Sequence, residues 1–230
     1  MIPTKICGIT RAEDALLAAE LGAAAIGFVF YSKSPRYIEA SAASHISAQL
    51  PSRLARVGVF VNPEFETLTI TAESAHLTHI QLHGDESIEC CQLAPLPVIK
   101  TVRNATELEK YVHAPVAAFL IDSKTPNQFG GTGQIADWNF CRQVREHAPV
   151  ILAGGLSASN IAAAIELTSP DAVDLSSAIE SSPGVKDRQK LHEFFAALQK
   201  IEAGEVRLGR DDFSNFAKPY CPSRTSPFGG

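Results

Sequence analysis

The chain has 230 residues, of which 45% are hydrophobic and 20% charged, and its mean hydropathy is +0.03. This composition is typical of a globular domain and excludes fibrous, disordered and membrane-spanning classes. The 20 Lys and Arg against 25 Asp and Glu give a formal net charge of −5, and without a basic run we expect no nucleic-acid partner.

Short β-branched apolar runs alternate along the chain with amphipathic or Ala-rich stretches of helical length. The predicted strands are Thr4–Cys7, Ala25–Phe30, Arg56–Val61, His79–Leu82, Val98–Val102, Ala117–Ile121, Val150–Leu152 and Ala172–Leu175. The predicted helices are Arg11–Leu21, Ala42–Leu50, Pro63–His76, Glu86–Leu93, Ala105–Val112, Trp138–Glu146, Ala158–Leu167 and Asp187–Lys200.

Eight strand–helix units within about 200 residues predict a single-domain α/β fold, a closed (βα)8 TIM barrel. The strands are apolar on both faces, as parallel strands covered by helices are. An open doubly wound sheet is the alternative. Cys7-Gly8-Ile9-Thr10 follows the first strand in place of a G-x-G-x-x-G motif, which argues against a dinucleotide-binding fold.

The alternation ends near Lys200, so we expect residues 1–200 to form the barrel. Residues 201–230 contain four Gly and three Pro and are predicted to be a C-terminal tail or linker. Their aromatic residues leave two alternatives open: docking on the barrel, or a junction to a fused or partner enzyme. These aromatic residues are Phe213, Phe216, Tyr220 and Phe228.

The N-terminal segment and the cysteines bear on the compartment. The first 20 residues show no charged segment followed by an apolar one, and no run of about 18 apolar residues occurs. We therefore expect a cytoplasmic protein that binds no membrane. Five cysteines without C-x-x-C spacing suggest neither a disulfide framework nor a metal site.

Two neighbouring loops predict a phosphate-binding site. Gly154 and Gly155 follow the seventh strand, where bare backbone N–H groups can approach an anion, and Ser176 and Ser177 follow the eighth. In (βα)8 barrels the loops after these two strands form the usual phosphate site. The alternative is that the glycine pair only makes a tight turn.

Two residues at strand ends are candidates for acid–base chemistry. Cys7 ends the first strand, so its thiol is expected to face the barrel mouth, with Lys5 on the same side as a candidate cation to lower its pKa. Asp122 ends the sixth apolar strand, where an apolar setting would raise a carboxyl pKa and suit a proton donor. A packing cysteine and a capping aspartate are the alternatives.

Other loops add candidate substrate contacts. Arg36 lies in a loop where its guanidinium could take a carboxylate bidentately, although a surface arginine is the alternative. Gln81 and His83 share one side of the fourth strand. The Gly-rich loop of residues 123–136 is long enough for a lid.

The loop sequences, taken in order, resemble the phosphoribosylanthranilate isomerase family of tryptophan biosynthesis. The resemblance runs from residue 3 to about residue 200. It is carried by Lys5–Thr10, Ala25–Phe30, Ser34–Tyr37, Val57–Asn62, Gln81–Asp85, Gly130–Gly133, Leu152–Leu156 and Pro183–Asp187.

The resemblance implies an Amadori rearrangement of N-(5-phosphoribosyl)anthranilate to 1-(2-carboxyphenylamino)-1-deoxyribulose 5-phosphate, without cofactor or metal. It implies Asp122 as general acid and Cys7 as general base, and Arg36 as the partner of the anthranilate carboxylate. The remaining implied contacts to this phosphosugar substrate are Gln81, His83, Gly131, Thr132, Gly133 and Asp174, with Gly154, Gly155, Ser176 and Ser177 on the phosphate.

One departure and two alternatives accompany the resemblance. Ala178 stands where the family usually has glycine. A methyl group there would crowd the phosphate or be incompatible with a backbone of positive φ, so we expect a working phosphate site of altered affinity. The related sugar-phosphate isomerase of histidine biosynthesis is one alternative, although its first-strand base is an aspartate, unlike Cys7. A phosphosugar-binding barrel without catalytic activity is the other, although Cys7 and Asp122 are both present.

Overall fold

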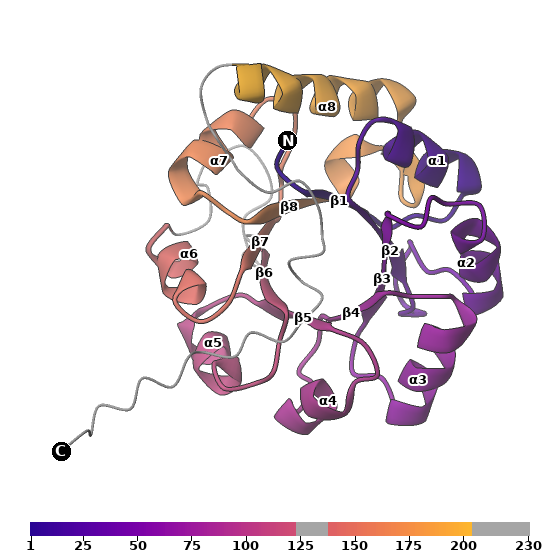
Figure 1. Ribbon diagram of the computed structural model, residues 1–230, viewed down its shortest axis with the longest axis vertical. Helices are drawn as coiled ribbons and strands as arrows, with labels where there is room; N and C mark the ends of the chain where they lie inside the picture. The colour runs from indigo at the N-terminus through magenta and orange to yellow at the C-terminus, as the bar shows by residue number, and fades with distance from the viewer. Residues whose placement is uncertain (123–137, 204–230) are drawn as a thin grey trace.

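The computed structural model describes residues 1–122 and 138–203 and shows a closed barrel of eight parallel strands in sequential order (Figure 1). The strands are β1 (Thr4–Cys7), β2 (Ala25–Val29), β3 (Ala55–Phe60), β4 (His79–Leu82), β5 (Val98–Val102), β6 (Ala118–Asp122), β7 (Val150–Ala153) and β8 (Ala172–Leu175). The ring closes between β1 and β8, where Lys5 pairs with Asp174. The prediction of a (βα)8 barrel is confirmed.

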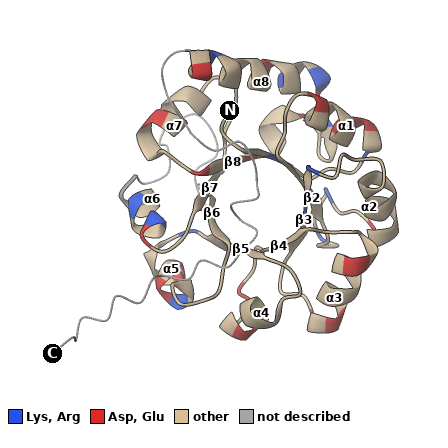
Figure 2. Cartoon of the chain, viewed as in Figure 1, with Lys and Arg blue, Asp and Glu red and all other residues tan. Residues whose placement is uncertain are grey.

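The helices form the outer ring (Figure 1). They are α1 (Ala12–Glu20), α2 (Ala40–Ser47), α3 (Phe65–Ser74), α4 (Ile88–Leu93), α5 (Ala105–Tyr111), α6 (Trp138–Arg145), α7 (Ile161–Thr168) and α8 (Arg188–Ala203). Their charged residues of both signs are spread around this ring (Figure 2). None of the helices in the described ranges is long and apolar enough to cross a membrane.

Successive side chains of each strand point alternately outward and inward, so the core has one layer under the helices and one inside the barrel. Polar side chains of several strands also point inward. On β1, Ile6 packs in the large apolar cluster under the helices, whereas Lys5 and Cys7 take the other side. The barrel interior is filled by small and branched side chains. These are Ala25, Ala55, Val57, Ile99, Ala117, Ala118, Leu120, Ile151, Ala153 and Ala172.

Two features after β8 were not predicted from the sequence. A short 3-10 turn at Ser177–Ile179 leads into a two-stranded antiparallel hairpin, β9 (Glu180–Ser182) and β10 (Val185–Lys186). The helix α8 then runs to Ala203, three residues past the expected end of the barrel at residue 200. The rest of the predicted tail, residues 204–230, lies outside the described residues.

Candidate active site

A pocket of about 270 Å³ opens at the carboxyl ends of the strands. It is lined by residues of β1 to β4 and β6 to β8 or of the loops that follow them, which include most of the predicted site. In the described ranges the predicted residues that line it are Cys7, Arg36, Gln81, His83, Asp122, Gly154, Gly155, Asp174, Ser176 and Ser177. The predicted lid residues Gly131, Thr132 and Gly133, with the rest of the loop 123–136, lie outside the described residues.

Cys7 lies at the pocket wall with a buried cation behind it. Lys5 is fully buried on the same face of β1, and its Nζ donates to Asp174 Oδ1 at 2.9 Å. Burial lowers the pKa of Lys5, but Asp174 and Cys7 together more than offset this, so that pKa is raised and the ammonium stays charged. Gly27 makes room for the thiol, because a Cβ there would lie 2.8 Å from Cys7 Sγ.

The expected lowering of the Cys7 pKa is not found. Burial raises the pKa of the Cys7 thiol, and the nearby charges of Lys5 and Lys186 lower it only in part. The net pKa therefore lies above the ordinary value, because desolvation of a thiolate is the largest of these effects. In the chain without substrate, Cys7 is a thiol at neutral pH.

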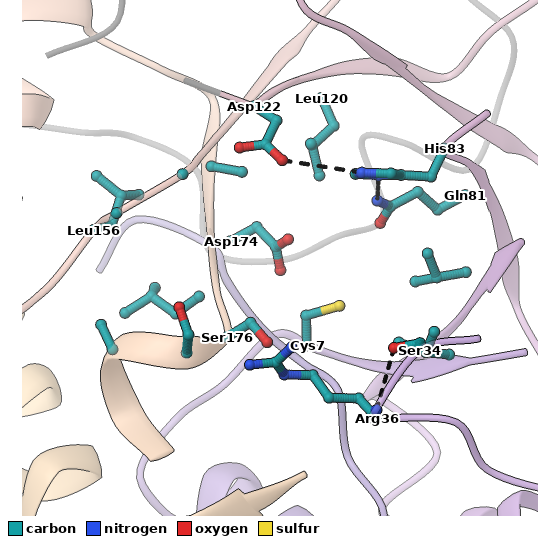
Figure 3. Close-up of a pocket in the computed structure, with 18 of the residues that line it drawn as sticks. Cys7, Ser34, Arg36, Gln81, His83, Leu120, Asp122, Leu156, Asp174 and Ser176 are labelled. Atoms are coloured by element: carbon teal, nitrogen blue, oxygen red, sulfur yellow. Dashed lines mark hydrogen bonds and ion pairs between the residues drawn. The ribbon is translucent and has the colours of Figure 1, made fainter. Parts of the chain in front are cut away.

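Asp122 lies on the opposite wall, beside His83 (Figure 3). Asp122 Oδ2 is 3.9 Å from His83 Nε2, too far for a direct hydrogen bond. Burial lowers the pKa of His83 against the pull of Asp122, so the imidazole is neutral near pH 7. Its Nδ1 lies 2.9 Å from Thr101 Oγ1 and 3.2 Å from Gln81 Nε2, which fixes the ring.

Arg36 reaches the pocket beside Cys7 and Ser176 (Figure 3). Its Nε and Nη2 donate to the carboxylate of Glu180 at 2.9 and 2.6 Å. Arg36 therefore makes the predicted bidentate contact with a carboxylate, but this carboxylate belongs to Glu180 of the same chain. One edge of the guanidinium is used in this way, and the edge bearing Nη1 remains for a ligand.

The two predicted phosphate loops meet at one side of the pocket. Gly154 and Gly155 have φ of 84° and 68°, in the left-handed region that favours glycine. Ser176 and Ser177 line the same pocket from the neighbouring loop. A Cβ at Gly155 would meet nothing within 4 Å, so there is space for a ligand against the backbone. The arrangement suits an anion held by backbone N–H groups.

Ala178 also lines the pocket, so its methyl group is placed where crowding of a phosphate was expected. Its backbone is unstrained, because the non-glycine residues of positive φ in the described ranges are Asn62, His76 and Ser169. The concern about a φ that only glycine adopts therefore does not apply in this conformation.

The sequence interpretation missed two charged residues that contact the site from behind. Glu180 holds Arg36, and Lys186 donates to the backbone oxygen of Cys7 at 2.6 Å. Lys186 belongs to the Pro183–Asp187 motif and Glu180 to the segment after β8, but neither ends a barrel strand. A rule that inspects only strand ends therefore passes over them.

Among the residues that the structure describes, no three His, Cys, Asp or Glu side chains lie close enough together to hold a metal ion. The other described cysteines pack elsewhere. Cys91 and Cys141 are buried, and Cys90 is partly buried. Cys7 and Asp122 are groups that can exchange protons, and the glycine-bearing loop and Arg36 can bind anions.

Comparison with known proteins identifies the family. The model of the family described as N-(5'phosphoribosyl)anthranilate (PRA) isomerase matches residues 4–197. The chain belongs to this family. The PRA isomerase of Syntrophus aciditrophicus is 42% identical over 205 residues, 88% of this chain and 89% of the relative. That of Geotalea uraniireducens is 45% identical over 196 residues, 84% of this chain and 97% of the relative.

Solved PRA isomerase structures share the fold. The enzyme of Thermotoga maritima is 41% identical, with a TM-score of 0.79 covering 87% of this chain and 100% of that one. A second structure is a PRA isomerase in complex with reduced 1-(o-carboxyphenylamino)-1-deoxyribulose 5-phosphate. It is 38% identical, with a TM-score of 0.76 covering 87% of this chain and 100% of that one.

Proposed function

We propose that this chain catalyses the Amadori rearrangement of N-(5'-phosphoribosyl)anthranilate to 1-(2-carboxyphenylamino)-1-deoxyribulose 5-phosphate in tryptophan biosynthesis. Membership of the PRA isomerase family supports the reaction. The observation that carries it in this structure is the placement of Cys7 and Asp122 on opposite walls of one pocket. A rearrangement made of proton transfers needs an acid and a base on different sides of the substrate.

Asp122 is the proposed general acid. Its carboxyl group protonates the ribose ring oxygen, the C1′–O bond breaks, and the sugar opens to a protonated Schiff base with the anthranilate nitrogen. The neutral imidazole of His83, which Thr101 and Gln81 hold in orientation, lies 3.9 Å from that carboxylate. His83 and Gln81 therefore also offer polar contacts to the opened sugar.

Cys7 is the proposed general base. Its thiolate removes the C2′ proton of the Schiff base, and the electron pair moves to form the enolamine, which tautomerises to the ketone. The cation of Lys5 lies behind the thiol, and it stabilises the thiolate as the proton moves. Because the Schiff base is itself positively charged, its formation in the pocket also favours the thiolate form.

Anion binding at two ends fixes the substrate between these groups. The loops bearing Gly154, Gly155, Ser176 and Ser177 are proposed to bind the phosphate, and the free edge of Arg36 the anthranilate carboxylate. Asp174 pairs with Lys5 at the pocket floor, where it can accept a bond from a substrate hydroxyl. Anchors at both ends place the reacting atoms without a cofactor.

A fluorescence assay of phosphoribosylanthranilate turnover tests the proposal with wild type, Cys7→Ser and Asp122→Asn. Each variant should lose about 10²- to 10⁴-fold in kcat, since a positioned proton transfer is worth about that much. Wild-type turnover retained in Asp122→Asn would refute the acid, and an inactive wild type that binds the product analogue would favour the non-catalytic phosphosugar-binding barrel. Turnover of the histidine-pathway substrate instead would support that alternative.

The compartment and the tail complete the proposal. We place the enzyme in the cytoplasm, where a reducing environment keeps Cys7 as a thiol. The idea that residues 201–230 join a fused or partner enzyme is tested by assaying a chain that ends at Lys200 beside the full chain.

A further inference from the structure

Arg36 is held by a hairpin that lies far away from it in the chain. Glu180 begins β9 and Lys186 ends β10, and the two are directly opposite in the antiparallel register, so their side chains lie side by side. Lys186 Nζ donates to Glu180 Oε1 at 2.8 Å, and both side chains are almost fully buried, 0% and 4% exposed.

Lys186 also binds the backbone on two neighbouring strands. Its ammonium donates to the carbonyl oxygen of Cys7 at 2.6 Å and lies 3.4 Å from that of Ser176. Its backbone N–H donates to Asp14 Oδ2 on α1 at 2.9 Å. One buried cation therefore connects the end of β1, the loop after β8 and the hairpin.

Glu180 holds Arg36 from the side away from the pocket. Arg36 lines the pocket, whereas Glu180 does not. Burial raises the pKa of Glu180, but the bonds from Arg36 and Lys186 more than offset this and leave that pKa lowered, so Glu180 is ionised. A Cβ at Gly8 would lie 2.6 Å from Arg36 Cδ, which shows how closely the stem of Arg36 packs on the backbone after β1.

We propose that Glu180 and Lys186 are positioning residues for substrate recognition: Glu180 orients Arg36 so that its free edge meets the substrate carboxylate, and Lys186 holds Glu180 in register with Cys7 and Ser176. This inference rests on the proposed function. Neither residue touches the substrate in this scheme, and both act through Arg36.

The charge of Glu180 and its orientation of Arg36 have opposite effects on the binding of the substrate carboxylate. Glu180 is negative and lies behind the site that receives a negative carboxylate, so its charge alone weakens binding of that carboxylate. Glu180 can therefore favour binding only through the orientation that it imposes on Arg36. Removing the charge without changing the shape, as in Glu180→Gln, separates the two effects, because charge alone predicts tighter binding and orientation predicts weaker binding.

The experiment measures calorimetric affinity for two probes, so that it does not depend on turnover. The first is the reduced product, 1-(2-carboxyphenylamino)-1-deoxyribitol 5-phosphate, and the second is the same molecule without the carboxylate. Wild type should prefer the first. Glu180→Gln should reduce that preference by about tenfold or more, since bidentate charge-assisted contacts depend on alignment, while affinity for the second probe stays within about twofold.

Two further variants guard against a general loss of structure. Glu180→Gln with Lys186→Met removes both charges and leaves no buried ammonium unpaired. It should unfold at a temperature close to that of wild type and show the same loss of preference. Glu86→Gln is the matched control, because Glu86 pairs with buried Lys100 at 2.8 Å without contacting Arg36, and it should leave the preference unchanged.

The outcomes separate the inference from the proposed function. Equal weakening of both probes, unchanged preference or increased preference in Glu180→Gln would overturn the inference, as would equal affinity of wild type for the two probes. Turnover of phosphoribosylanthranilate by wild type is measured in parallel. Its absence overturns the proposed function, whereas the ratio of the two affinities still decides the role of Glu180.

Discussion

At the scale of single residues, the position of Cys7, the proposed base, disfavours its ionisation. Cys7 is buried, and burial raises the pKa of its thiol above the ordinary value although Lys5 and Lys186 act against it. A higher pKa makes the thiolate a stronger base but a rarer species at neutral pH. One limb of the dependence of rate on pH therefore reports the state of this side chain.

Because turnover needs Cys7 as the thiolate and Asp122 as the protonated acid, we expect a bell-shaped dependence of kcat/KM on pH, with one limb set by the raised pKa of Cys7. The measurement is a pH–rate profile of the free enzyme. In Cys7→Asp the base is a carboxylate of lower pKa, so that limb should move to lower pH. An unmoved limb would show that another group titrates.

The residues that could be predicted from the sequence are those whose position follows from strand alternation. Cys7 and Asp122 end apolar strands, and inward-facing pairs follow at a period of two. The partner of Arg36 could not be predicted in this way, because Glu180 is 144 residues away along the chain and the contact depends on how two loops meet. The direction of the Cys7 pKa also needed the depth of burial, which no local pattern gives.

At the scale of elements, the loop after β8 combines the proposed phosphate site with the support of Arg36. The 3-10 turn Ser177–Ile179 places Ala178 at the pocket, and β9 follows directly. The barrel strands were predicted because each is an apolar run, but β9 and β10 have only three and two residues and show no hydrophobic period. Short hairpins of this kind are defined by tertiary contacts.

Ala178→Gly tests the effect of the methyl group at the phosphate loop. We expect KM to fall by about two- to tenfold, because relief of the overpacking caused by one methyl group against the phosphate is worth about 1 kcal/mol. The thermal unfolding temperature, measured on the same preparation, should decrease slightly, as glycine adds freedom to the unfolded chain. An unchanged KM would mean that the phosphate does not contact this methyl group.

At the scale of the whole molecule, two buried Lys–Glu pairs connect loops on different parts of the ring. Lys186 pairs with Glu180, and Lys100 pairs with Glu86 at 2.8 Å while also donating to the carbonyl oxygen of Gly84 at 2.6 Å. Burial raises the pKa of Glu86, but Lys100 and backbone N–H groups more than offset this and lower it. Both glutamates are thus ionised when folded.

The free energy of unfolding should therefore decrease as the pH is lowered. A glutamate whose pKa is lowered by folding stabilises the fold above its unfolded pKa of about 4.3, and this stabilisation is lost as pH falls through the folded pKa. Glu86→Gln should lower the free energy of unfolding by about 3–5 kcal/mol at pH 7 by leaving Lys100 unpaired. Urea titrations at pH 7 and pH 3 should show the difference narrowing in acid, and a constant difference would contradict the ion pair's role.

The order of folding follows from the ring itself. Because Lys5 and Asp174 are 169 residues apart along the chain, the site is complete only after a contact of very long range has formed. On refolding from urea, the far-ultraviolet circular dichroism signal should recover before catalytic activity. Simultaneous recovery of both signals in one phase would argue that ring closure and helix formation occur together.

The seam between β1 and β8 has a further consequence during synthesis. Translation delivers β1 first, and β8, with which it pairs, among the last parts of the barrel. Until then the nascent chain presents Cys7 to water, with an ordinary thiol pKa and without Asp174 beside Lys5. This thiol is therefore most open to oxidation or alkylation before the ribosome has released β8. In the finished enzyme it is buried at the pocket wall, and only molecules that enter the pocket reach it.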